Sequence, residues 1–253
     1  MCTILILSRP TSSTPLILGA NRDEFYDRPT AAPSMVSQSP PIFAGRDLRA
    51  GGTWFGVRPD GFLVALTNQP ESNRRLSGRI SRGTLVTELL TLADTESARR
   101  FLSRLTLNPY NHFNLLAGYP DDIFVAYGRD GVALDTVPTG FSVLGNGRLN
   151  SPSLAKVARA RDLFCHRGPS TDPSLVIQSI LADRFFSNDD QVKHSFRPPA
   201  LDSICVKTPL YGTRSSVRVT FGRRAIESYY YADGPPDEVP FVDLTRKIRP
   251  AQP

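Results

Sequence analysis

Two stretches near the N-terminus decide the fold: residues 1–8 read MCTILILS, and residues 16–24 read LILGANRDE. The apolar part of each stretch predicts a buried strand. Residues 10–15 between them are rich in Ser, Thr and Pro and predict a turn, so the two strands form a hairpin. This hairpin returns the polar residues 21–24 to the neighbourhood of Cys2.

Blocks of predicted strands alternate with pairs of predicted helices along the rest of the chain. Connections within each strand block are hairpin-like, which favours antiparallel sheets. Ser81 is the predicted N-cap of the first helix, and Ser151-Pro152 and Asp172-Pro173 open the second pair. Residues 29–41 contain four prolines and predict a loop. The strand patterns lie at residues 3–7, 16–21, 51–57, 62–67, 113–118, 123–127, 132–134, 141–144, 203–207, 215–221 and 225–231.

This order predicts an α+β fold with four layers. Two antiparallel sheets stack on each other, and a helix pair covers the outer face of each sheet, which gives an α-β-β-α sandwich. We expect one domain over residues 1–232. Residues 233–253 are proline-rich, and we expect them to form a poorly ordered C-terminal tail.

Composition excludes several classes of protein. The chain has 253 residues, of which 40% are hydrophobic and 21% are charged, so neither a disordered chain nor a coiled coil fits. No apolar run reaches the roughly 18 residues of a transmembrane helix. Residues 1–8 have no basic leader, and their apolar run is too short for a signal peptide, so we expect a cytoplasmic protein. Oligomeric state is not predicted.

The net charge of +6 comes mainly from arginine, because lysine occurs at only four positions. The arginines are scattered, which argues against nucleic-acid binding and favours attraction to anionic substrates or lipid headgroups. The cysteines, Cys2, Cys165 and Cys205, form no CxxC pair, and the three histidines lie far apart. We therefore expect no disulfide framework, no metal site and no cofactor.

Cys2 is the strongest candidate for chemistry. Removal of Met1 would leave a residue with both a thiol and a free α-amine, whose ordinary pKa values are about 8.5 and about 7.7–8.0. The amine can then act as the base that activates the thiol. Asp23 could hold the amine over the thiol, and Arg22 could lower the thiol pKa or bind a substrate carboxylate. The alternatives are an incidental cysteine and a charged hairpin exit on the surface.

Several short motifs follow Cys2 in a fixed order. They are Asn21-Arg22-Asp23-Glu24, GGTWFG at 51–56, Thr67-Asn68, Ser81-Arg82-Gly83, YNHFNLL at 110–116, Asn146-Gly147 and YGTRS at 211–215. Together with Met1-Cys2-Thr3 they resemble the NRDE family, which includes the transport and Golgi organisation protein 2 homologues. The resemblance extends to about Tyr231 and implies the fold of the N-terminal-nucleophile hydrolases. More distantly the chain looks like bile-salt hydrolases and penicillin V acylases, which begin with Met-Cys and cut amide bonds.

The resemblance also implies roles for single residues. Cys2 matches the nucleophile, and Asp23 matches the aspartate beside the α-amine. Asn68 matches an asparagine of the oxyanion hole. Two further matches are Asn146, to a second asparagine near the nucleophile, and Arg214, to a late arginine that supports the site.

The match has one departure and leaves local alternatives open. The related enzymes carry an arginine where this chain has Ala20. Read from the sequence alone, Asn68 is a turn residue before Gln69-Pro70, and Asn146 is a left-handed turn residue before Gly147.

The expected function is hydrolysis of the carbon–nitrogen bond of a small amide by a cysteine nucleophile, or acyl transfer from such an amide. Asn21, Arg22, Glu24 and Trp54 are the expected substrate-binding residues, although Trp54 also fits a core or cavity wall. The resemblance supports one alternative, a non-catalytic protein that binds or carries haem or lipid on the same fold, for which arginines would suit the haem propionates.

Overall fold

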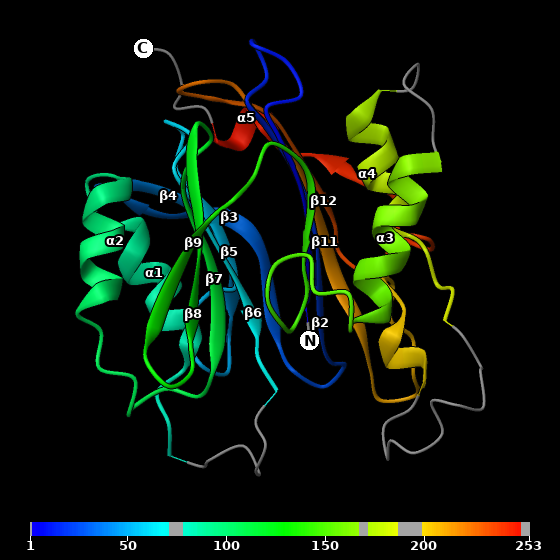
Figure 1. Cartoon of the computed structure of the whole chain (residues 1–253), viewed down its shortest axis with the longest axis horizontal. Helices are drawn as coiled ribbons and strands as arrows, with labels where there is room; N and C mark the ends of the chain where they lie inside the picture. Colours follow the sequence, from blue (N-terminus) through cyan, green and yellow to red (C-terminus); the bar gives the residue numbers. More distant parts are fainter. Residues whose placement is uncertain (1, 71–77, 167–171, 187–198, 249–253) are drawn as a thin grey trace.

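The computed structural model describes residues 2–70, 78–166, 172–186 and 199–248. Its strands form two antiparallel sheets that stack face to face (Figure 1). Helices α1 and α2 cover the outer face of one sheet, and α3 and α4 cover the outer face of the other (Figure 1). The predicted α-β-β-α sandwich is confirmed.

The first sheet has six strands in the order β10-β1-β2-β11-β12-β13, and the second has seven in the order β3-β4-β5-β6-β7-β8-β9. The first contains β1 (Cys2–Ser8), β2 (Leu16–Phe25), β10 (Gly140–Leu144), β11 (Tyr211–Phe221), β12 (Ile226–Ala232) and β13 (Val242–Asp243). The second contains β3 (Thr30–Gln38), β4 (Pro41–Asp47), β5 (Phe55–Val57), β6 (Leu63–Asn68), β7 (Phe113–Tyr119), β8 (Asp122–Gly128) and β9 (Val132–Thr136). The helices are α1 (Arg82–Leu90), α2 (Thr95–Ser103), α3 (Ala155–His166), α4 (Pro173–Leu181), α5 (Thr245–Ile248) and the 3-10 helix η2 (Pro199–Asp202).

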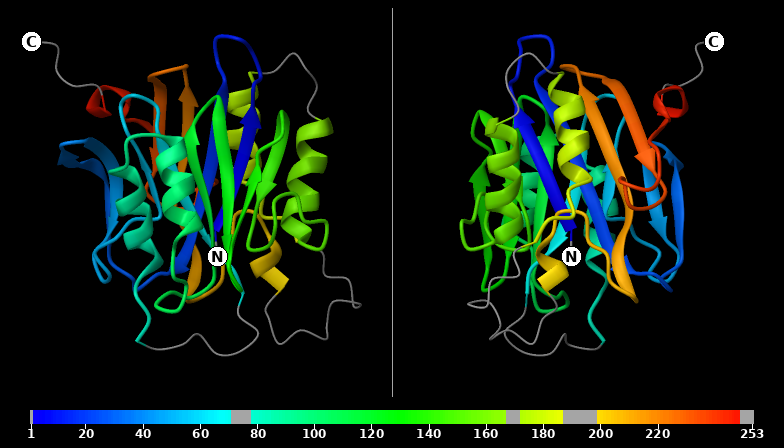
Figure 2. Two further views of the ribbon diagram at one scale, coloured as in Figure 1. Left: turned by 60° about the vertical axis from the view of Figure 1, so that its left-hand side comes forward. Right: turned by 90° about the vertical axis from the view of Figure 1, so that its right-hand side faces the viewer.

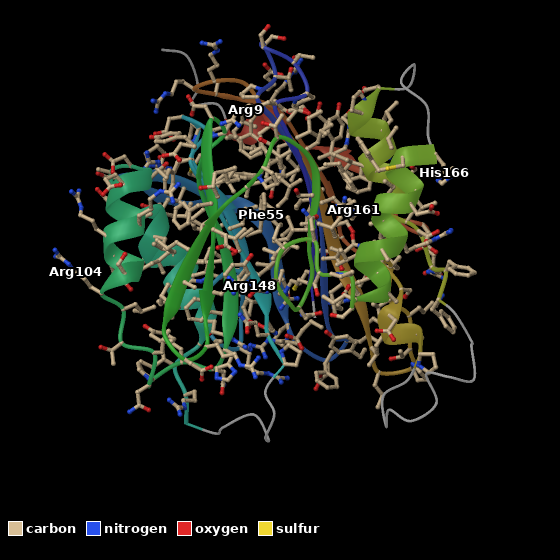
Figure 3. All side chains as sticks on the ribbon, in the orientation of Figure 1. Arg9, Phe55, Arg104, Arg148, Arg161 and His166 are labelled. Atoms are coloured by element: carbon tan, nitrogen blue, oxygen red, sulfur yellow. The ribbon has the colours of Figure 1, made fainter. Side chains whose placement is uncertain are left out.

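The alternation of side chains on β1 explains why the sequence needs a layer on each side of this sheet. Ile4 and Ile6 are fully buried in the core between the sheets, which also contains Phe55 (Figure 3). Leu5 and Leu7 point the other way and pack in the core beneath α3 and α4. A strand that is apolar on both faces must be covered on both, and the sandwich provides this cover.

The sequence predicts the polar residues at the starts of three helices, and two of these predictions are confirmed. Ser81 caps α1 by accepting a hydrogen bond from the backbone N–H of Gly83, and Asp172 caps α4. The third case is wrong, because α3 begins at Ala155 and not at Ser151-Pro152. Within the described ranges, no helix combines the length and the apolar composition that a membrane-spanning segment requires.

Two local predictions are wrong. Residues 29–41 are not a loop, since most of them form β3, an edge strand whose ladder with β4 is interrupted by register shifts. Prolines are tolerated on edge strands, where a missing N–H breaks no inner ladder. Residues 203–207 are not a strand either, apart from a single bridge at Lys207. Ile204, Cys205 and Val206 are consecutively buried, so packing rather than pairing explains their apolar character.

Residues 233–248 differ from the expected poorly ordered tail. Strand β13 pairs with β12, and the Thr245 hydroxyl accepts a hydrogen bond from the Tyr229 backbone N–H at 2.9 Å. Leu244 and Ile248 are buried in the core between the sheets. These apolar side chains outweigh the effect of the prolines that precede them. Residues 249–253 lie outside the described ranges.

Candidate active site

A cavity of about 490 Å³ is lined by Cys2, the first residue of β1. Figure 2 shows that β1 begins at the opposite end of the sheet from the β1–β2 turn. Cys2 is the first residue of β1 and is paired in register with Arg22 on β2. Because side chains alternate along a strand, Cys2 shares the face of Ile4 and Ile6, toward the space between the sheets. The thiol therefore lies where the inter-sheet core ends and the cavity begins.

The Cys2 thiol is held in its neutral form. Cys2 is buried, and burial raises the pKa of its thiol above the ordinary value. The nearby Asp23 carboxylate raises the thiol pKa further, whereas a hydrogen bond from the Asp23 backbone and the charge of Arg22 lower it. A base must therefore remove the thiol proton before the sulfur can attack a substrate. Met1 lies outside the described residues, so its removal stays a prediction.

Asp23 is a fully buried carboxylate with two polar neighbours from distant parts of the chain. Its Oδ1 accepts a hydrogen bond from the hydroxyl of Thr213 on β11 at 2.7 Å. Its Oδ2 lies 3.6 Å from Nζ of Lys156 on α3. Burial raises the pKa of Asp23 above its ordinary value, and both Lys156 and Thr213 act in the opposite direction.

Lys156 is a cation beside this site that sequence reasoning missed. Its side chain is only 3% exposed, and its Nζ also donates a hydrogen bond to the Thr3 hydroxyl at 3.2 Å. A buried lysine is rare unless it is paired, and here the pair is with Asp23. The signal in the sequence was a lysine on the inward stripe of α3, beside Val157 and four residues before Ala160.

Asn68 and Asn146 are neighbours, but they face different cavities. Asn68 ends β6 and lines the cavity that contains Cys2. The Asn146 side chain donates a hydrogen bond to the Asn68 carbonyl oxygen at 2.6 Å, and Asn146 lines a second cavity. The reading of Asn146 as a left-handed turn residue is wrong, because the described non-glycine residues with positive φ are Arg9 and Asn150.

Two polar side chains that belong to the quoted motifs, but had no role assigned from the sequence, anchor the loop that carries Asn146. The Thr67 hydroxyl donates to the Gly145 carbonyl at 2.7 Å. The Asn114 side-chain amide donates to the carbonyls of Gly145 and Gly147 at 3.2 and 2.9 Å. Together they fix this loop against the end of β6, next to Asn68.

Asn21 does not reach the cavity, which corrects its assignment as a substrate-binding residue. Its side-chain amide donates to the carbonyls of Leu181 and Ile204 at 2.8 and 3.0 Å. Its carbonyl oxygen accepts from the Ser216 hydroxyl at 2.6 Å. Asn21 is fully buried, and these three hydrogen bonds join β2 to the end of α4, to the segment at Ile204 and to β11.

Three other predicted substrate-binding residues do line the cavity: Arg22, Glu24 and Trp54. The Trp54 ring is half-buried and also packs against the inter-sheet core. Arg214 is not part of the lining described for this cavity. It is the extra residue of a bulge in β11, between Thr213 and Ser215, and a bulge redirects its side chain relative to a regular strand.

The glycines of two predicted motifs bring the start of α1 to the cavity wall. A Cβ atom on Gly52 would lie 2.5 Å from the backbone of Gly83, and the Thr53 N–H donates to the Gly83 carbonyl at 3.3 Å. Only glycine permits this close approach of two backbones. Ser81, Arg82 and Gly83 consequently line the cavity.

Comparison with known proteins adds a family to this geometry. Residues 1–230 match the Transport and Golgi organisation 2 (TANGO2) family. The chain belongs to the TANGO2 family. It is 33% identical to the Transport and Golgi organization protein 2 homolog of Bos taurus, over 89% of this chain and 93% of that protein. The Homo sapiens homolog is 32% identical over the same shares. The family membership predicted from the motifs is confirmed.

Solved structures place this TANGO2-family chain on the N-terminal-nucleophile hydrolase fold. A variant of the conjugated bile acid hydrolase from Clostridium perfringens superposes with a TM-score of 0.58 at 11% identity, covering 97% of this chain and 93% of that one. The N-acylethanolamine-hydrolyzing acid amidase ortholog of Caenorhabditis elegans superposes with a TM-score of 0.54 at 13% identity, covering 86% and 92%. At these identities the likeness shows the fold alone.

Proposed function

We propose that this TANGO2-family protein is a cysteine N-terminal-nucleophile hydrolase that cleaves the carbon–nitrogen bond of a small amide. One observation carries the proposal. Cys2 is the first residue of a buried strand, and it lines a cavity beside the buried Asp23–Lys156 ion pair. The two solved structures that share the fold are named as a bile acid hydrolase and an acid amidase, which supports the same class of reaction.

The reaction begins after removal of Met1. The α-amine of Cys2 takes the thiol proton as Sγ attacks the carbonyl carbon of the amide. The carbonyl oxygen becomes an oxyanion, which the Asn68 side-chain amide stabilises. The ammonium then gives its proton to the leaving nitrogen, the C–N bond breaks, and a thioester remains on Cys2. Water attacks the thioester with the amine as base, which releases the carboxylic acid and restores the thiol.

Asp23 and Lys156 act as positioning residues in this scheme. The Asp23 carboxylate holds the α-amine in place, and Lys156 keeps that carboxylate charged in a buried setting. The Thr213 hydroxyl fixes the rotation of the carboxylate through its hydrogen bond to Oδ1. The related enzymes carry an arginine at the position of Ala20, and this chain lacks that cation. Lys156, paired with Asp23, supplies a cation beside the site instead.

The proposal is tested by incubating the purified chain with a panel of N-acyl amides and by following both turnover and the mass of the N-terminal peptide. We expect release of free amine from at least one amide and an acyl group attached to Cys2 when the reaction is quenched early. Turnover with the acyl group on another residue would contradict the mechanism. Binding of haem or lipid without hydrolysis of any amide would favour the carrier alternative.

Processing of the N-terminus gives a separate prediction. We expect the intact mass of the active protein to lack Met1. A chain with leucine inserted between Met1 and Cys2 retains its first residues, because a large second residue blocks methionine removal, and its Cys2 has no α-amine. We expect this chain to fold but to hydrolyse no amide. Equal activity of the two chains would exclude the α-amine as the base.

Asn68 gives a prediction for the transition state. We expect Asn68→Ala to lower kcat by about 10²–10³-fold with little change in KM, because an oxyanion donor acts mainly in the transition state. Gln69→Ala is the matched control, since Gln69 adjoins Asn68 but its amide donates to Phe113 and Asn114. An Asn68→Ala variant with unchanged kcat would remove the oxyanion role.

A further inference from the structure

Trp54 lies between the Cys2 cavity and a second, much narrower space. It lines the Cys2 cavity. It also lines a crevice between the two sheets, together with Phe55 of β5, Val217 of β11 and Tyr229 of β12. This crevice has a volume of about 10 Å³, which is room for about one water molecule. Trp54 is therefore the boundary between the larger cavity and the crevice.

The indole of Trp54 is supported by aromatic rings of the core between the sheets. The Trp54 side chain is partly buried and packs against that core. Its ring centroid lies 5.7 Å from that of Phe55, and the Phe55 centroid lies 6.3 Å from that of Tyr229. Rings at these distances pack against one another. The rings that support the indole are thus also the rings that line the crevice behind it.

Trp54 and Leu66 give the cavity an apolar surface beside the reacting groups. The Leu66 backbone N–H donates a hydrogen bond to the Trp54 carbonyl at 2.8 Å, and both residues line the cavity. Leu66 precedes Asn68 by two residues on β6, and side chains two residues apart on a strand share a face. Cys2 points toward the same inter-sheet core against which Trp54 packs. A group bonded to the Cys2 sulfur therefore has an apolar surface within the same cavity.

We propose that Trp54 determines the length of the acyl group that the site accepts. A short apolar acyl chain on the Cys2 sulfur covers the indole and Leu66, and the indole closes the way into the crevice for a longer chain. The acyl group stays on Sγ until water attacks the thioester, whereas the amine leaves first, so the fit of the acyl group affects both steps. This inference rests on the proposed function and deepens it by naming the substrate class, amides of short-chain apolar carboxylic acids.

The test attaches alkyl chains of different length to Cys2 without any hydrolysis. The reagents are methyl, butyl and octyl methanethiosulfonate. The thiolate attacks the sulfur that bears the alkyl chain, an S–S bond forms, and methanesulfinate leaves. In alkaline buffer the reaction does not need the α-amine as a base. For each reagent, the rate at Cys2 divided by the rate at the exposed Cys165 cancels the reactivity of the reagent itself.

The dependence of this rate ratio on chain length tests the boundary. In the wild-type chain we expect a higher ratio for the butyl than for the octyl reagent. Trp54→Ala opens the crevice, and we expect it to raise the octyl ratio, relative to the methyl ratio, by about tenfold or more, since one methylene group in a hydrophobic pocket can change a rate that much. Trp54→Phe keeps a smaller ring and should give an intermediate value.

The control is Phe185→Ala, which removes an exposed aromatic ring outside the lining described for both spaces, and it should leave the chain-length profile unchanged. An octyl ratio that Trp54→Ala does not raise would overturn the proposal. No reaction of Cys2 with the methyl reagent would overturn it too, because the cavity would then not admit even the shortest chain to the thiol.

Fluorescence gives a second measurement that needs no variant. Trp54 is the only tryptophan of the chain, so the tryptophan emission reports on this position alone. We expect a butyl chain on Cys2, compared with a methyl group, to shift the emission to shorter wavelength and to protect it from quenching by acrylamide, because the chain displaces water from the indole. Equal emission and equal quenching of the two labelled chains would overturn the contact between the chain and Trp54.

Failure of the proposed hydrolase gives a different result from failure of this inference. In the first case the chain-length profile and the fluorescence shift persist while no amide is cleaved. In the second case amides are cleaved, but Trp54→Ala leaves the ratio of kcat/KM for short and long acyl groups unchanged.

Discussion

Cys2→Ala is expected to abolish amide hydrolysis, by about 10⁴-fold or more, while the chain stays folded. The thiol is the only proposed nucleophile, and loss of a nucleophile leaves only binding and the oxyanion donor to act on the substrate. The fold should tolerate the change because Cys2 lies at the start of β1, beside the cavity, where removal of one sulfur leaves a small void. Turnover and thermal unfolding, measured on the same sample, check both halves of this prediction.

The control for Cys2→Ala is Cys165→Ala, which removes an exposed thiol from α3 and is expected to keep full activity. Cys2→Ser adds a finer test, since its hydroxyl is a much weaker nucleophile at neutral pH but fits the same space. Activity of Cys2→Ala within tenfold of wild type would remove Cys2 as the nucleophile, whatever substrate is found.

The layers of the fold could be predicted because they rest on local patterns. A strand such as β1, apolar on both faces, must lie between two covering layers, and the helix stripes supply the outer ones. The errors came from long-range effects. Most of residues 29–41 form β3 because β3 pairs with β4 as an edge strand, where prolines are tolerated. Residues 204–206 are apolar because they are buried, and Ile204 packs against α4 and accepts a hydrogen bond from Asn21 of β2. Neither neighbour is visible in the local sequence.

The candidate site could be predicted in part for the same reason. The hairpin of β1 and β2 places Cys2 beside Arg22 and Asp23 from local pairing alone. Side chains from distant segments could not be placed: Lys156 comes from α3 and Thr213 from β11. Asn21 is the opposite case. Its place in the motif predicted a role in substrate binding, but its side chain joins β2 to neighbouring segments.

Lys156→Met is expected to destabilise the folded chain by about 3–5 kcal/mol at neutral pH, because it leaves the Asp23 carboxylate buried without its cation. Methionine has a similar volume and suits an apolar surrounding, so lost packing contributes little. The exposed Lys247→Met is the matched control and is expected to change the free energy of unfolding by less than about 0.5 kcal/mol.

The pH dependence distinguishes this electrostatic effect from lost packing. The pKa of Asp23 is already raised in the folded chain by burial, and removal of Lys156 takes away an influence that lowers it. A raised pKa in the folded state means that stability falls as pH rises through the range between the unfolded and folded values. The difference between Lys156→Met and wild type should therefore shrink as pH falls toward the ordinary range of a carboxylic acid, and should grow toward neutral pH.

The double variant Asp23→Asn/Lys156→Met completes the argument, because it replaces both charges with neutral groups of similar size. We expect urea unfolding to show the double variant more stable than Lys156→Met at neutral pH, with little pH dependence from this site. It should remain inactive, since no carboxylate holds the α-amine. A double variant as unstable as the sum of the two single variants would show that Lys156 and Asp23 act independently, and Lys156 would then lose its role as the residue that keeps Asp23 charged.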